Sequence, residues 1–219
     1  MDKEDFTQKF KDDPNFPELK NLKDIQVDTI IGAIKLSPNQ LDPKGNRTKN
    51  WAKNQQRGGK DYIPPLGWTG IGIKVEDIYD NGDNTWLGSK NFSGEWCVAY
   101  HGVGNKQESD NVKHTVGEII KNEFKAGPGQ RHKDCPDAFH PKTKKKVGEG
   151  VYCTPQIKAA EKYAGKSNIN GINYKTVIMV RVKPDAIRHC NQRNDSRDND
   201  YWVVNGTTDE IRPYRILYK

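Results

Sequence analysis

Two segments of the chain carry side chains suited to holding a small flat molecule. His101 and Gly102 follow a short apolar run, where glycine lets a ligand approach the backbone and histidine can bind it. Gly150 enters a second apolar run that carries Tyr152, and Tyr163 follows eleven residues later. Two tyrosines placed in this way can form the walls of a slot for an aromatic ring. Taken alone, each segment also fits an ordinary turn or a pair of core tyrosines.

Two carboxylates are candidates for acid–base or electrostatic chemistry. Asp200 stands at the head of the apolar run 201–204, and Glu210 lies on the segment after it. A carboxylate at a strand end can stabilise a developing positive charge or take a proton. An acid in a solvated turn is the simpler interpretation of either residue by itself.

These residues need strands and helices to position them. Alternating or continuous apolar runs predict strands over 68–75, 96–100, 150–154, 176–182, 201–204 and 215–218. Helical spacing of apolar residues predicts helices over 115–124 and 155–163, and a less regular one over 24–36. Many short strands with few helices favour an α+β fold.

Composition excludes several classes of protein. The 219 residues contain 36 Lys and Arg against 29 Asp and Glu, a net charge of +7, and no run is long and apolar enough for a membrane span. From the charged start we expect no secretory signal, and hence reduced cysteines and an intracellular protein, cytoplasmic or nuclear. We predict an N-terminal extension over 1–60, partly helical with a basic loop, and a domain over 61–219. The oligomeric state is not readable from the sequence.

Taken together and in this order, the segments are more specific than any one alone. The chain resembles the poly(ADP-ribose) polymerase-like branch of the ADP-ribosyltransferases over about 95–219. The matching positions are His101-Gly102, then Gly148-Glu149-Gly150-Val151-Tyr152 with Tyr163, and finally Asp200-Tyr201-Trp202-Val203-Val204. The resemblance implies a split antiparallel sheet and NAD+ as co-substrate, cleaved at its nicotinamide–ribose bond.

The resemblance also implies a role for each residue. The Gly102 backbone would hold the nicotinamide carboxamide, and His101 would bind a ribose hydroxyl. Tyr163 would stack on the nicotinamide, with Tyr152 as the opposite wall. The carboxylate would stabilise an oxocarbenium-like transition state and orient a protein or nucleic-acid acceptor.

Two positions depart from the family pattern. Ala160 replaces the usual hydroxyl three residues before the second tyrosine, which removes one nicotinamide contact. Asp200 replaces the usual Glu and is shorter by about 1.5 Å, so either the backbone brings Asp200 closer or Glu210 takes its place. In this family, departure from Glu accompanies transfer of a single ADP-ribose. A fold that binds NAD+, ADP-ribose or nucleic acid without turnover is the alternative.

Two further clusters have weaker interpretations. His132, Cys135 and His140 are dense in zinc-ligand types, with Cys153, His189 and Cys190 further on, but their spacing fits no standard zinc site, and we expect no metal. The basic run 142–146 either steers an anionic substrate or is a solvated loop.

Overall fold

The computed structural model describes residues 27–45, 47, 51, 55–104, 109–125, 138–139, 150–190 and 200–219. Within these ranges the chain is α+β, as the sequence predicts, and its strand pairs are antiparallel. The helices are α2 (Val27–Ala33), α3 (Ser109–Asn122) and α4 (Ile157–Glu161). The strands are β1 (Gln55–Arg57), β2 (Lys60–Tyr62), β3 (Thr69–Gly72), β4 (Cys97–Gly102), β5 (Ala138–Phe139), β6 (Val151–Cys153), β7 (Lys166–Ile169), β8 (Ile172–Val182), β9 (Arg188–Cys190), β10 (Tyr201–Val204) and β11 (Ile211–Tyr218).

The larger sheet has the strand order β3-β11-β8-β4, and β7 forms a hairpin with β8. Its central strand, β8, is buried at every position from Thr176 to Val182. A continuous apolar run rich in β-branched residues is what a strand covered on both faces requires. β4 is a strand of this sheet and is paired along its whole length with the buried strand β8.

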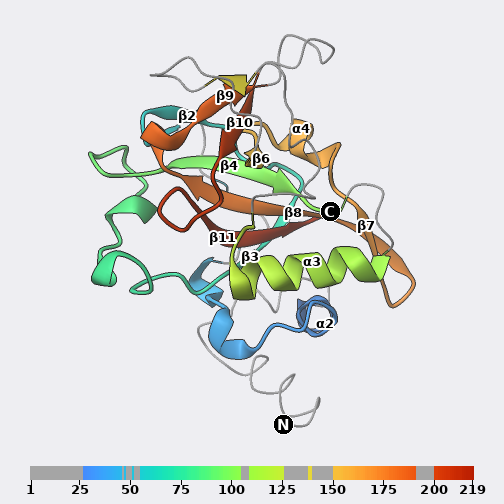
Figure 1. Cartoon of the computed structure of the whole chain (residues 1–219). Coiled ribbons are helices and arrows are strands. Elements are labelled where there is room, and N and C mark those ends of the chain that lie inside the picture. The colour runs from blue at the N-terminus through green and yellow to red at the C-terminus, as the bar shows by residue number, and fades with distance from the viewer. Residues whose placement is uncertain are drawn as a thin grey trace.

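The smaller sheet has the order β5-β9-β10-β6 and lies beside the larger one (Figure 1). One antiparallel bridge joins β4 to the end of β6: Tyr100 and Thr154 exchange N–H···O bonds of 2.8 and 3.0 Å. The two sheets thus meet at this bridge and separate beyond it.

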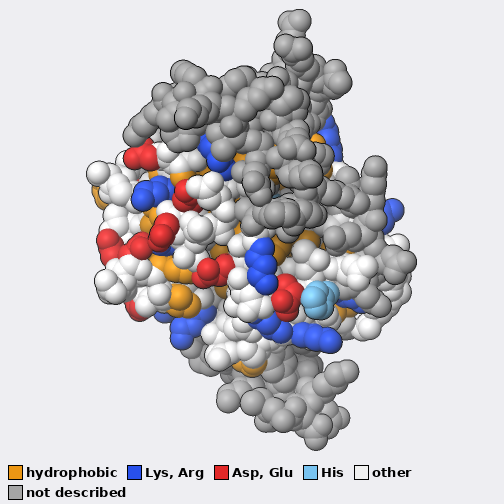
Figure 2. Space-filling model, in the orientation of Figure 1, with side chains coloured by type: hydrophobic (Ala, Val, Ile, Leu, Met, Phe, Trp, Pro, Cys, Tyr) orange, Lys and Arg blue, Asp and Glu red, His pale blue; other side chains and the backbone are white. Residues whose placement is uncertain are grey.

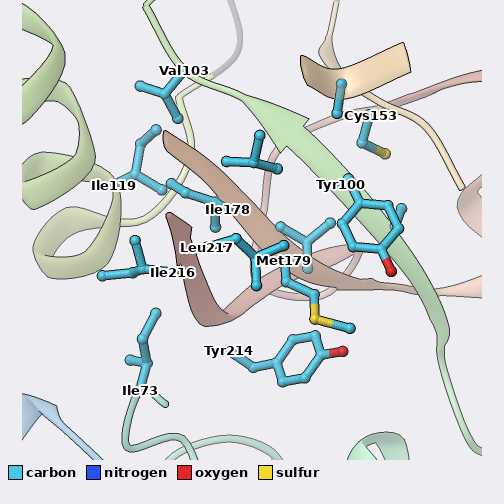
Figure 3. Close-up of a cluster of buried hydrophobic side chains, with 14 of the residues drawn as sticks. Ile73, Tyr100, Val103, Ile119, Cys153, Ile178, Met179, Tyr214, Ile216 and Leu217 are labelled. Atoms are coloured by element: carbon cyan, nitrogen blue, oxygen red, sulfur yellow. The ribbon is translucent and has the colours of Figure 1, made fainter. Parts of the chain in front are cut away.

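Helix α3 covers one face of the larger sheet, and α2 lies against α3, where the Cα of Gly117 faces the Ile34 carbonyl. Figure 3 shows Ile119 of α3 among side chains from β8 and β11, including Ile178 and Ile216. This core is continuous with apolar residues of β4 and β6, so it ties the two sheets together.

The described part of the predicted extension packs against the same core. Ile30, Ile31 and Ile34 of α2 are buried, and Trp51 is buried as well. Isolated bridges pair Leu41 with Ile73 and residue 47 with Gly70, which places this segment along the edge of the larger sheet beside β3.

The predicted elements are present, with shifted ends. The strand expected over 201–204 has those bounds in β10, whereas β8 and β11 begin four residues earlier than predicted. Helix α3 begins six residues early, and α4 is only five residues long. His101 and Gly102 are the last two residues of β4 itself.

Candidate functional site

The sheets separate at His101. In a continuing antiparallel ladder, the residues next exchanging main-chain bonds after Tyr100 and Thr154 would be Gly102 and Tyr152. Instead the Tyr152 carbonyl accepts a 2.8 Å hydrogen bond from Nδ1 of His101. The imidazole therefore stands where the ladder would continue, between β4 and β6. Two motifs that are 51 residues apart in the chain meet here.

The register divides the predicted site residues between two faces. Paired residues of antiparallel strands point to the same face, and neighbours along a strand alternate. The face of Tyr100 carries Gly102, Tyr152, Tyr201 and Val203, because Tyr152 pairs with Val203. We call this the Tyr100 face.

The opposite face, the His101 face, carries the histidine and the acid. His101 and Cys153 follow and precede the bridged pair, Trp202 pairs with Cys153, and Asp200 lies two residues before Trp202. Beyond the bridge β4 and β6 are no longer paired, so a molecule lying between these two strands could contact residues of both faces. The register thus divides the predicted residues near the bridge into two groups, one on each face.

Gly102 and Tyr163 are in contact on the Tyr100 face. A Cβ added to Gly102 would lie 2.3 Å from the Ala160 carbonyl oxygen and 2.8 Å from the Cβ of Tyr163. Only glycine permits this approach. The Tyr163 ring meets the Tyr201 ring edge to face, with centroids 5.9 Å apart, and Tyr152 packs in the same cluster.

The backbone of Gly102 faces the separation between the sheets. The N–H and C=O groups of Tyr100 point to β6, and main-chain groups of a strand alternate in direction, so those of Gly102 point the same way. Gly102 thereby presents one donor and one acceptor side by side, on the side where β6 has moved away.

His101 is held in one protonation state. Its ring packs edge-on against Phe124, with centroids 5.1 Å apart. Burial lowers the pKa of His101 below 6.5, and the bond to the Tyr152 carbonyl opposes this shift less strongly. The neutral ring must keep its proton on Nδ1, because a carbonyl only accepts, so Nε2 is left as an acceptor.

Asp200 is fixed by two ring donors. Its Oδ1 lies 2.8 Å from Nδ1 of His189, and its Oδ2 accepts a 2.6 Å bond from Nε1 of Trp202. Its charge also reaches Cys153: burial is the main cause that raises the pKa of that thiol, and the Asp200 carboxylate adds to it. Asp200 therefore lies at the end of β10 nearest the bridge between the sheets.

Glu210 and Gly150 lie at the other end of β10. The Glu210 carboxylate accepts bonds of 2.6 and 2.7 Å from the backbone N–H and side-chain amide of Asn205, closing the turn before β11. A Cβ on Gly150 would stand 2.4 Å from the Val204 carbonyl oxygen, so this glycine allows close packing onto β10. Asp200 and Glu210 thus lie at opposite ends of β10.

Sequence reasoning treated His189 only as a possible zinc ligand and did not single out Phe124. The pairing of β9 with β10 places His189 opposite Trp202. Local sequence does not show this pairing, so no signal pointed to His189. The proposed ligands His132, Cys135 and His140, the basic run 142–146, Gly148 and Glu149 lie outside the described residues. Among the described residues no three His, Cys, Asp or Glu side chains are grouped to hold a metal ion.

The face of the molecule in Figure 2 is mixed in charge. On the face in Figure 2, basic and acidic side chains lie next to one another. The helices in the described ranges are all too short or too polar to cross a bilayer. Cys97 and Cys153 are buried free thiols. No protein-family model matches the chain, and no curated protein matches it.

Proposed function

We propose that this protein is an NAD+-dependent ADP-ribosyltransferase that cleaves the nicotinamide–ribose bond and transfers one ADP-ribose to a protein or nucleic-acid acceptor. The observation that carries the proposal is the meeting of distant motifs where the sheets separate. His101 binds the main chain of Tyr152, and Gly102 contacts Tyr163. The split antiparallel sheet is the form that the family resemblance leads us to expect.

Gly102 suits a carboxamide. Nicotinamide carries a primary amide, and one donor with one acceptor on a strand residue complements it. Tyr163 lies against Gly102 and is placed to contact a ring held there. Ala160 supplies no hydroxyl at this point, which removes a hydrogen bond worth about 0.5–1.5 kcal/mol.

His101 suits a hydroxyl. With Nδ1–H committed to the Tyr152 carbonyl, Nε2 of the neutral ring accepts a hydrogen bond from a ribose hydroxyl. The Phe124 contact and the backbone bond hold the ring still, so little side-chain entropy is lost when the donor binds. His101 thus fixes the pose of the ribose.

Asp200 suits the charge that develops on the ribose. As the bond to nicotinamide breaks, positive charge spreads over C1′ and the ring oxygen. A carboxylate oriented in advance by His189 and Trp202 stabilises that charge without reorganising. Nicotinamide leaves with the bonding electron pair, and the acceptor forms the new bond to C1′.

Labelled NAD+ tests the proposal. The protein is incubated with NAD+ labelled in the nicotinamide and the ADP-ribose parts, and released nicotinamide and bound ADP-ribose are both measured. We expect His101→Ala to lower nicotinamide release about a hundredfold. His114→Ala, which changes an exposed histidine of α3, is the matched control and leaves it unchanged. Absence of release from the wild-type protein refutes the proposal.

The substitutions Ala160 and Asp200 favour a second candidate, a module that binds NAD+, ADP-ribose or nucleic acid without turnover. Calorimetry separates the two functions. Saturable binding of NAD+ or ADP-ribose with no nicotinamide release supports the module. Binding of RNA or DNA that weakens steeply with salt identifies nucleic acid as the partner.

A further inference from the structure

Asp200 holds a second histidine beside it. Nδ1 of His189 lies 2.8 Å from Asp200 Oδ1, and the edge of the His189 ring faces Trp202 with centroids 6.4 Å apart. A carboxylate only accepts hydrogen bonds, so the neutral His189 ring carries its proton on Nδ1. Its Nε2 is then the basic nitrogen, as in any arrangement where an acid orients an imidazole.

This histidine is reachable from solvent. The side chains of His189 and Asp200 are 43% and 37% exposed, whereas Trp202, which braces both, is 1% exposed. Within the described residues, Nε2 of His189 has no hydrogen-bond partner. The ring is thus oriented on one side and open on the other.

The sheet register places His189 on the far side of Asp200 from His101. Both histidines are on the His101 face, in the strand sequence β4, β6, β10, β9. His189 on β9 is one strand away from Asp200, which precedes β10, at the usual spacing of about 4.8 Å, and β6 lies on the other side of β10. With the ribose placed between His101 and Asp200 by the proposed function, His189 lies beyond Asp200, on a solvent-exposed side from which an acceptor can approach.

We propose that His189 is the base that takes the proton from the acceptor, with Asp200 holding its ring. This inference rests on the proposed function and adds a residue to it. As the acceptor oxygen or nitrogen bonds to C1′ of the ribose, its proton moves to Nε2 of His189. The bond from C1′ to nicotinamide breaks, nicotinamide leaves with the electron pair, and the adjacent Asp200 carboxylate stabilises the imidazolium.

The test uses NAD+ with two nucleophiles, water and azide. Water must lose a proton when it attacks, whereas the azide anion has none to lose. His189→Ala removes the ring. His189→Asn removes the base but keeps an N–H close to the position of Nδ1, so it keeps the contact that orients Asp200. His114→Ala is the control.

We expect both His189 variants to form ADP-ribose in water about a hundredfold more slowly than the wild-type protein. Azide restores their nicotinamide release and gives ADP-ribosyl azide, identified by mass. If His189→Asn forms ADP-ribose in water as fast as the wild-type protein, His189 is not the base and only orients Asp200. A variant that azide does not rescue also overturns it. Wild-type protein that releases no nicotinamide with either nucleophile overturns the proposed function itself.

Discussion

Replacing Gly102 with Ala tests the contact with the Tyr163 segment on which the proposed NAD+ site depends. The added methyl group would lie 2.3 Å from the Ala160 carbonyl oxygen, and ordinary contact begins at 3.4 Å. The opposing atoms are main chain of the segment around α4 and the Cβ of Tyr163, so no flexible side-chain tip can move aside. The segment must shift by about 1 Å, a displacement that costs on the order of a hundredfold in rate when it moves a positioning group.

The same substitution lowers the free energy of unfolding. Overpacking a tight interior costs about 1–3 kcal/mol, and for a chain of this size each kcal/mol lowers the melting temperature by about 2–4 °C. We therefore expect Gly102→Ala to melt roughly 2–12 °C below the wild type and to release nicotinamide about a hundredfold more slowly.

Gly32→Ala is the matched control. An added Cβ there meets nothing within 4 Å, and the residue is an exposed position of α2. Alanine favours a helix over glycine by about 0.5–1 kcal/mol, so this variant melts at or slightly above the wild-type temperature. Scanning calorimetry and a nicotinamide-release assay measure both variants. If Gly102→Ala matches the wild type in both assays, the described packing of Tyr163 on β4 is wrong.

Three further predictions concern the two sheets and the turn before β11. His101→Asn keeps an N–H for the Tyr152 carbonyl but loses Nε2, so it melts closer to the wild type than His101→Ala while its nicotinamide release falls as far; equal melting of the two variants contradicts the bond. Folding lowers the pKa of His101 below 6.5, so the folded state resists protonation of this ring. The contribution of neutral His101 to stability is complete above pH 6.5 and declines as the pH falls from 6.5 through the lowered pKa. The melting temperature of the wild type should therefore fall over this range more than that of His101→Asn, and parallel pH profiles of the two proteins would contradict this prediction. Glu210→Gln weakens two charge-assisted hydrogen bonds from Asn205, so it lowers the free energy of unfolding by about 1 kcal/mol, measured by urea titration. Nicotinamide release should not change. A large loss of release would assign the acid role to Glu210 instead of Asp200.

The sequence by itself determined the local elements near the site. Short continuous runs of β-branched and aromatic residues favour buried strands, and β10 and the centre of β8 lie where such runs predict them. The ends shifted because pairing partners decide where a strand stops: β8 extends back to Ile172 through its hairpin with β7, a contact that no periodicity encodes.

Only the tertiary structure decided how the chemical groups are arranged. Sequence motifs singled out His101, Tyr152, Tyr163 and Asp200 as candidates, but the faces they occupy depend on one bridge between β4 and β6, because a shift of one residue in register reverses every side chain. A different long-range pairing, that of β9 with β10, brought His189 to Asp200. Contacts between residues far apart in the chain follow from the packing of whole sheets, and local sequence carries no record of that packing.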